Sequence, residues 1–365
     1  MKLGIFYSKV EAPEADLRWL AAHGFDAVTT GDEPALQAQA RQQGLEPWAC
    51  LGTFNPPSGA PELLCVDVGG NRQKWFGSGC PNNPEVRAAS LDRYRRAASR
   101  EQVEGVFCDG ARFASPASGL DAFCTCFCDH CVQAADRLGL DFARMKRDVT
   151  GLHQALSSGD APLASAVAGS ALAVVGRFAT APGIVDWLAF RRAVITDFIG
   201  QISRVVRGQR KLFGGYFFSP CLSALVGQDY HALAEHVDLF APMLYRNCSE
   251  RGGIAPVNTE IHAIASWSRN CPDPAWVLEL VGLPGERFSS TDELLTRGVS
   301  SEAVRVETAR ARALIGPAKS LAPIIWWDDP GIRDTMAAVR LGGADGVSIF
   351  LFHQRLKELL CAESA

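Results

Sequence analysis

Short apolar runs recur along the chain and are separated by amphipathic stretches. Most of the runs lack the alternation of a half-exposed strand, which favours strands covered on both faces by helices. The strand candidates are residues 3–7, 27–30, 47–51, 106–109, 212–218, 239–245, 276–281, 324–327 and 347–352. Helices are predicted at 14–23 and 34–43, each followed by a glycine, and after Asn83, which is a typical N-cap before Pro84.

This alternation of strands and helices predicts an α/β protein, and its length suits a (β/α)8 TIM barrel. A doubly wound sheet is the main rival, but no Gly-x-Gly-x-x-Gly follows the first strand. Nine candidates compete for eight places. Residues 276–281 and 347–352 are expected to be the last two barrel strands, and 324–327 an extra strand or loop.

The barrel is expected to form a single domain over residues 1–365. A long gap between strands, residues 110–209, is expected to be an elaborated excursion after strand 4. It carries a cysteine cluster and two helical stretches, 131–138 and 183–207. Such an excursion is expected at the carboxyl-end face, where barrel active sites lie.

Composition narrows the class of protein. The 365 residues carry 36 Lys+Arg against 40 Asp+Glu, so no basic excess points to nucleic acid. The chain begins with a short strand-like segment rather than a signal sequence, and no stretch is long and apolar enough for a membrane span. A cytoplasmic protein without nucleic-acid or membrane partners is expected.

Four of the twelve cysteines fall within eight residues, at positions 124, 126, 128 and 131. Close spacing without a secretion signal favours a metal over disulfides. Cys126, Cys128 and Cys131 can converge on one ion, and zinc prefers four ligands. The fourth could be Cys124, Cys108, His130 or a distant residue such as Cys80, which precedes the Asn83 cap. Four thiolates would close the shell, so this zinc would be structural.

The same residues allow a different metal. Cys124-x3-Cys128-x2-Cys131 has the spacing with which radical S-adenosylmethionine enzymes hold an iron–sulfur cluster. In that family the motif follows the first barrel strand, whereas here it follows the fourth. The iron–sulfur enzyme therefore stays as an alternative.

Acidic residues at strand ends are the candidate catalytic groups. Glu279 lies within an apolar run, where a carboxylate is costly unless partnered or used, and where burial would raise its pKa. Asp109 ends the fourth strand, before Gly110, and Arg112 is close enough to orient it. Each residue also has a purely structural interpretation. Glu279 could form an ion pair with an arginine at the rim of the barrel, and Asp109 could cap a helix or turn.

Aromatic residues are expected on the same rim: Tyr245, Trp326 and Trp327. Flat rings stack on sugar faces, and polar side chains such as Arg112 and Asp328 can bond hydroxyls. Paired carboxylates with aromatics are what cleavage of a glycosidic bond requires. The alternative is that these rings belong to the core.

Two motifs carry a resemblance. Cys80-Pro81-Asn82-Asn83-Pro84 and Cys126-Phe127-Cys128-Asp129-His130-Cys131 resemble the zinc site of family-42 glycoside hydrolases, the bacterial β-galactosidases, and of related uncharacterised barrels classed with the glycosyl hydrolases. The resemblance implies that Cys80, Cys126, Cys128 and Cys131 are the zinc ligands. Residues 278–285 are similar to the segment that holds the family's nucleophilic Glu, and 343–350 to its eighth strand.

The expected activity is therefore hydrolysis of a glycosidic bond in a carbohydrate substrate. Glu279 is expected to act as nucleophile or base, and Asp109 as the acid or the second carboxylate. The chain departs from the family where its acid/base Glu should be, because Asp109-Gly110 stands in place of Asn-Glu. A catalytically silent barrel that binds a carbohydrate or a protein is the second alternative.

Overall fold

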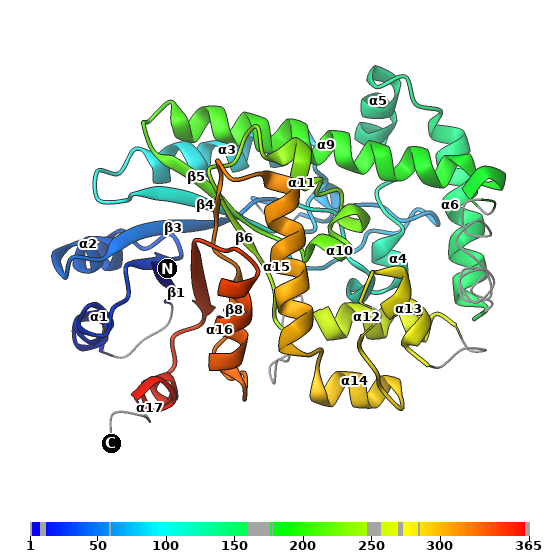
Figure 1. Ribbon diagram of the computed structural model, residues 1–365. Coiled ribbons are helices and arrows are strands. Elements are labelled where there is room, and N and C mark those ends of the chain that lie inside the picture. The colour runs from blue at the N-terminus through cyan, green and yellow to red at the C-terminus, as the bar shows by residue number, and fades with distance from the viewer. Residues whose placement is uncertain are drawn as a thin grey trace.

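The computed structural model describes residues 2–7, 12–57, 60–159, 176, 178–246, 257–268, 273–283 and 285–361. Within them, nine parallel strands form one sheet in the order β7-β6-β5-β4-β3-β2-β1-β9-β8, as predicted for an α/β barrel. Figure 1 shows helices surrounding this curled sheet. The strands are β1 (Lys2–Phe6), β2 (Ala27–Thr30), β3 (Glu46–Gly52), β4 (Gly105–Asp109), β5 (Leu212–Phe217), β6 (Leu239–Pro242), β7 (Ser320–Leu321), β8 (Ile324–Trp326) and β9 (Gly346–Phe350).

Two of the nine strands share one place in the ring. β7 pairs with β6, and β8 pairs with β9. Pro323 separates them and has no N–H to donate to a ladder. A parallel bridge from Met243 to Ile324, with the Leu244 N–H bonded to the Ile324 carbonyl at 2.9 Å, joins β6 to β8. The sheet therefore closes as an eight-position (β/α)8 barrel.

The helices follow the strands in the expected alternation. The first three are α1 (Pro13–Ala22), α2 (Pro34–Gln42) and α3 (Pro84–Ala98). Gly24 and Gly44 end the first two with φ near +80°, which confirms the predicted glycine stops. The predicted cap of α3 is confirmed too, because the Asn83 side chain accepts from the N–H groups of Glu85 and Val86.

The predicted excursion lies between β4 and β5. It contains η2 (Pro116–Ser118), α4 (Leu120–Phe123), α5 (Asp129–Arg137), α6 (Phe142–Ser157) and α9 (Pro182–Arg207). Figure 1 shows α9 running along the outside of the sheet, while α5 and α6 project beyond it. The remaining short elements before β6 are α10 (Pro220–Ser223), η3 (Ala224–Val226) and α11 (Tyr230–Leu233), and η1 (Pro61–Leu63) follows β3.

The prediction for residues 276–281 is wrong. They form α13 (Ala275–Leu280), and the expected extra segment 324–327 supplies the barrel strand instead. A short apolar run does not by itself distinguish a buried helix from a strand. The local signal was Asp273, whose carboxylate accepts from the N–H of Ala275, the first residue of the helix, at 2.8 Å.

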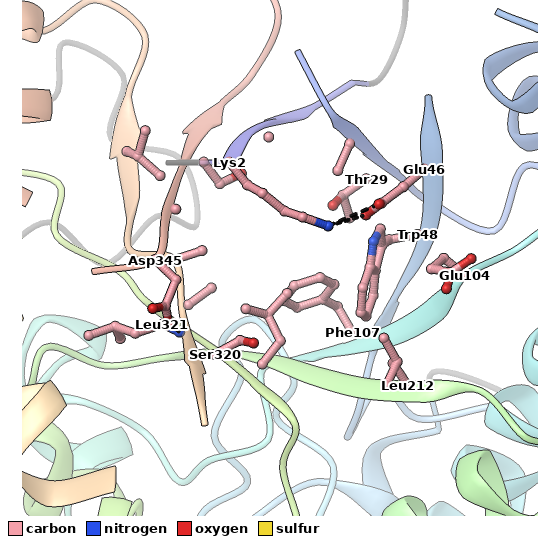
Figure 2. Close-up of a pocket in the computed structure, with 18 of the residues that line it drawn as sticks. Lys2, Thr29, Glu46, Trp48, Glu104, Phe107, Leu212, Ser320, Leu321 and Asp345 are labelled. Carbon is pink, nitrogen blue, oxygen red and sulfur yellow. Dashed lines mark hydrogen bonds and ion pairs between the residues drawn. The ribbon is translucent and has the colours of Figure 1, made fainter. Parts of the chain in front are cut away.

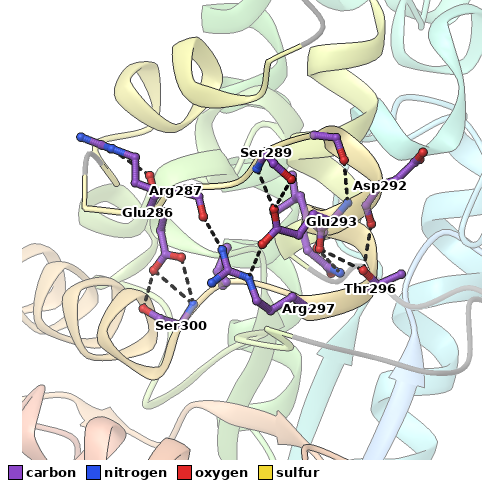
Figure 3. Close-up of polar contacts among 12 residues, drawn as sticks. Glu286, Arg287, Ser289, Asp292, Glu293, Thr296, Arg297 and Ser300 are labelled. Atoms are coloured by element: carbon purple, nitrogen blue, oxygen red, sulfur yellow. Dashed lines mark hydrogen bonds and ion pairs between the residues drawn. The ribbon is translucent and has the colours of Figure 1, made fainter.

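Between β6 and β7 the chain runs through α12 (Val257–Ser266), α13, α14 (Thr291–Arg297) and α15 (Ser301–Ile315). Figure 3 shows the polar contacts that start the last two. The Ser290 hydroxyl accepts from the Glu293 N–H, and the Glu293 carboxylate accepts from Ser289. Glu286 accepts from the Ser300 N–H at 3.1 Å. The chain ends with α16 (Ile332–Leu341) before β9 and α17 (Gln354–Cys361) after it.

No helix in the described parts of the chain combines the length and the apolar character needed to cross a bilayer.

Replacing Asn83 by Ala should lower the free energy of unfolding by about 1 kcal/mol, because two N–H groups of the first turn of α3 lose their acceptor. Urea unfolding measures the loss. Gln209→Ala at an exposed turn is the matched control and should change stability by less than about 0.5 kcal/mol. Equal stability of Asn83→Ala and wild type would contradict the capping role.

Candidate functional site

Four cysteine sulfurs converge where two distant loops meet. Cys80 lies in the connection from β3 to α3, just after the antiparallel bridge between Leu64 and Gly79. Cys126 and Cys128 lie in the excursion immediately before α5, and Cys131 lies in its first turn. Their sulfur atoms all lie within 4.8 Å of one another.

The spacing fits one ion held by four thiolates. Four sulfurs at about 2.3 Å from a tetrahedral ion are about 3.8 Å apart. The Cys80 sulfur lies 3.4 Å from that of Cys128 and 3.6 Å from that of Cys131, and the Cys128 and Cys131 sulfurs are 3.8 Å apart. None of these distances is a disulfide, which would bring the sulfurs to about 2.05 Å.

Nitrogen donors surround the sulfur cluster. The Val66 N–H points at the Cys126 sulfur at 3.3 Å, the Asn82 N–H at the Cys80 sulfur at 3.4 Å, and the Asn82 side-chain amide at the Cys131 sulfur at 3.3 Å. Such donors stabilise negative sulfur and orient metal ligands. The donor set thus suits a cation, and the closed shell suits a structural role.

Cys124 stands outside this group of four. It is buried, its sulfur is not part of the group of four, and the positive charge that acts on it is that of Arg191. The alternative set of Cys124, Cys128 and Cys131 therefore lacks its first member, whereas Cys80 joins the other three. This grouping is the one that the family resemblance implied.

A buried arginine fixes the loop that precedes the sulfur cluster. Arg191 of α9 donates to the carbonyls of Phe123, Thr125 and Leu225, at 2.7 Å to the latter two. Its guanidinium lies 3.8 Å from the centre of the Trp187 ring, and the Trp187 indole N–H also donates to the Thr125 carbonyl. Burial lowers the pKa of Arg191 to about 9. The loop is thus held from α9 independently of any ion.

A second polar group lies at the carboxyl ends of the strands. Asp109 ends β4, two residues after Phe107, so both side chains point into the barrel. Arg112 is buried, and the two carboxylates that act on its charge are Glu260 and Asp109. Its guanidinium lies over the Phe218 ring at 4.7 Å and donates to the Phe113 carbonyl. Asp109 and Arg112 thus act on each other through their charges.

Burial dominates the electrostatics of this group. It raises the pKa of Asp109 above its usual range, against the opposing effects of Arg112 and the Gly110 N–H. Burial likewise raises the pKa of Glu260, although the Ala117 N–H and Ser115 oppose it. It lowers the pKa of Arg112. Asp109 is only partly buried and is the member of the group with access to solvent.

The sequence analysis missed Glu260. It is 1% exposed and lies on α12, where its carboxylate accepts from the Ala117 N–H at 2.9 Å. The signal was present, because Glu260 falls on the same helical face as Val257, Ile261 and Ile264. A carboxylate on the apolar stripe of a helix needs partners inside the protein.

Glu279 is not on a barrel strand. It lies on the exposed side of α13, while Trp276, Val277 and Leu278 of the same helix are buried. The expected desolvation of its carboxylate, which rested on a strand, is therefore wrong. No contact in the described parts of the chain joins Glu279 to Asp109.

The predicted aromatic rim is buried. Tyr245 is 2% exposed and Trp326 1%, and their rings pack against each other and against Phe350 at 5.5–5.9 Å. Trp327 is covered by His353, stacked at 4.1 Å. These residues form the core at the carboxyl end of the barrel, which was the structural alternative.

Asp328, the remaining predicted contact for substrate, is partly buried beside Asp329. Asp329 is engaged in an ion pair with Arg246 and accepts from Thr335. Of the two neighbouring acids Asp328 and Asp329, the second therefore has a structural role.

Phe76 covers the position where the resembling family carries its acid/base Glu. Gly110 has φ +63°, and a Cβ placed on it would lie 3.1 Å from the Phe76 ring. Phe76 itself is 41% exposed. A side chain at residue 110 would require the ring to move.

Comparison with family models and with curated proteins gives no match. Similar solved structures include the spore cortex-lytic enzyme of Bacillus megaterium QM B1551 (TM-score 0.34, 11% identity, 73% of this chain and 48% of that chain). Others are the Vibrio harveyi exo-β-N-acetylglucosaminidase (0.44, 8%, 96% and 50%) and a D-psicose 3-epimerase (0.35, 10%, 97% and 85%). The chain spans about half the length of the first two. Matches at this level assign no activity, since one barrel fold carries many chemistries.

Purified protein should contain one metal ion per chain, because the four sulfurs offer one closed site. Cys128→Ser should reduce the metal content measured by elemental analysis to less than about one fifth and lower the melting temperature. Cys124→Ser, a buried cysteine outside the cluster, is the matched control and should keep the ion. Loss of metal from Cys124→Ser with retention in Cys128→Ser would refute this ligand set.

Proposed function

We propose that the barrel hydrolyses a glycosidic bond at its carboxyl-end face, with Asp109 as the proton donor. The supporting observation is a strand-end carboxyl whose pKa is raised by burial, in a residue that is only partly buried. A carboxyl that keeps its proton near neutral pH can protonate the leaving oxygen of a glycoside.

Arg112 and Glu260 support this donor rather than react. Glu260 is buried and accepts from the Ala117 N–H, and its negative charge acts on Arg112. Arg112 in turn lowers the pKa of Asp109, which limits the rise that burial causes. The three groups set how strongly Asp109 holds its proton.

The reaction needs a second carboxylate, and two candidates for it are tested by mutation. Glu279 was the sequence prediction for nucleophile or base, and its exposed place on α13 puts that prediction at risk. Glu260 is the other acidic group tied to Asp109 through Arg112. Glu279→Gln and Glu260→Gln therefore belong in the same assay.

The proposed cofactor is one structural zinc ion on Cys80, Cys126, Cys128 and Cys131. Zinc suits a closed tetrahedral set of thiolates and would tie the β3–α3 connection to the excursion. Iron in elemental analysis, with a brown colour under anaerobic purification, would instead favour the iron–sulfur alternative.

Carbohydrate binding without hydrolysis is the second candidate. Phe76 against Gly110 favours it, because the resembling family needs a Glu side chain at that point. In that case a sugar would bind at this face and remain intact after prolonged incubation with the protein.

Asp109→Asn should reduce the hydrolysis of phenyl glycosides about 10²–10⁴-fold. The loss should be smaller with 4-nitrophenyl glycosides, because that leaving group departs without help from an acid. Rates on both substrates, across galactosides, glucosides and N-acetylglucosaminides, measure the difference. Equal losses on both leaving groups would contradict the donor role, and full activity of Glu279→Gln would remove Glu279 from the mechanism.

The pH profile tests the same assignment. A proton donor is active below its pKa, so kcat/KM should fall as pH rises through the pKa of Asp109. Since burial raises that pKa, activity should persist above the range of an ordinary carboxyl. Asp109→Asn should lose this alkaline limb, and a limb that survives in the variant would have to arise from another group.

A further inference from the structure

An open cavity of about 250 Å³ enters the barrel from the face that carries the amino ends of the strands. Its lining comes from all eight positions of the ring, and Figure 2 looks into it. This face is opposite the one that carries Asp109 and Arg112. The cavity therefore does not belong to the site described above, and the inference below does not rest on the proposed function.

Small inward-facing residues create the space. The interior of such a barrel is ordinarily filled with layers of bulky branched side chains. Here Gly4, Ala241 and Gly346 line the cavity and put no more than a methyl group into it. Unfilled space costs stability, because the lining atoms lose contacts.

Two aromatic rings, tilted by 57° to one another, form part of the wall. Trp48 and Phe107 line the cavity with their ring centres 5.0 Å apart, and Tyr216 stacks on Phe107 at 4.7 Å. Each of the two lining rings lies against a glycine. A Cβ on Gly105 would lie 2.3 Å from the Trp48 ring, and one on Gly214 would lie 2.9 Å from Phe107. Because these glycines carry no side chain, the two rings can pack close to the barrel wall, and the space along the barrel axis stays open.

The mouth of the cavity is acidic. The charged lining residues are one ammonium and four carboxylates, which belong to Lys2 and to Glu46, Glu104, Asp238 and Asp345. Figure 2 shows Lys2 reaching across to Glu46, where the ammonium lies 2.9 Å from the carboxylate. The arginine partners of the other three carboxylates lie outside the lining.

We propose that this cavity binds a small aromatic amine. The ring would pack against Trp48 and Phe107, and the ammonium would sit at the acidic mouth beside Glu46 in place of Lys2. A cation is also attracted to the face of an indole ring. An enclosed cavity of about 150 Å³ accepts benzene, so about 250 Å³ leaves room for a ring with a two-carbon arm.

Three probes that share a phenyl ring and a two-carbon arm, and that end in a cationic, a neutral or an anionic group, test the assignment on the full chain. Isothermal titration with 2-phenylethylamine should give a dissociation constant below about 1 mM. 2-Phenylethanol should bind at least fivefold more weakly, and 3-phenylpropanoate should not bind. Absence of amine binding would overturn the proposal, and equal binding of amine and alcohol would overturn the assigned charge.

Variants locate the binding. Gly4→Val and Ala241→Leu each put a larger side chain into the cavity and should reduce amine affinity at least tenfold while circular dichroism stays native. Lys2→Gln removes the competing ammonium without touching the core and should tighten amine binding at least twofold. Leu341→Ala, at an exposed site on α16, is the control and should bind as wild type does. Unchanged affinity in Lys2→Gln and in a folded filling variant would refute this location.

Discussion

Closure of the parallel ring is the constraint from which the two faces of the molecule follow. The Met243–Ile324 bridge joins β6 to β8 and closes the ring, and all strands in this ring are parallel. All carboxyl ends then meet at one face and all amino ends at the other. The partly buried Asp109 lies at the first face, and the acidic cavity opens at the second.

The ring does not by itself hold the long excursion between β4 and β5. Its helices α5 and α6 project beyond the sheet. Helix α6 packs against α9, and the cysteine loop leads directly into α5. Two kinds of interaction hold the cysteine loop. Sulfur atoms from two connections converge on one point, and a buried guanidinium binds backbone carbonyls beside them.

The sequence allowed the architecture to be predicted further than the site. Strand runs, glycine stops and the Asn83 cap are local signals, and the structure confirms them. The close spacing of cysteines predicted a metal site, whereas the choice of Cys80 over Cys124 as a ligand came from the family resemblance. The prediction made residues 276–281 a barrel strand and 324–327 an extra segment, and the structure has the reverse. Both are short apolar runs, and only Asp273 before the first one indicates a helix. Glu260 was missed although its place on the apolar face of α12 was a local signal. The burial of the aromatic residues depends on contacts between distant segments.

The reach of Arg191 has a consequence for how the protein opens. One side chain bonds the Phe123 and Thr125 carbonyls in the cysteine loop and the Leu225 carbonyl in the connection that follows β5. Freeing any of these carbonyls leaves a buried cation short of acceptors, which raises the cost of moving one segment alone. The two connections, about a hundred residues apart in sequence, therefore behave as one cooperative unit, and their amide hydrogens should exchange with solvent together.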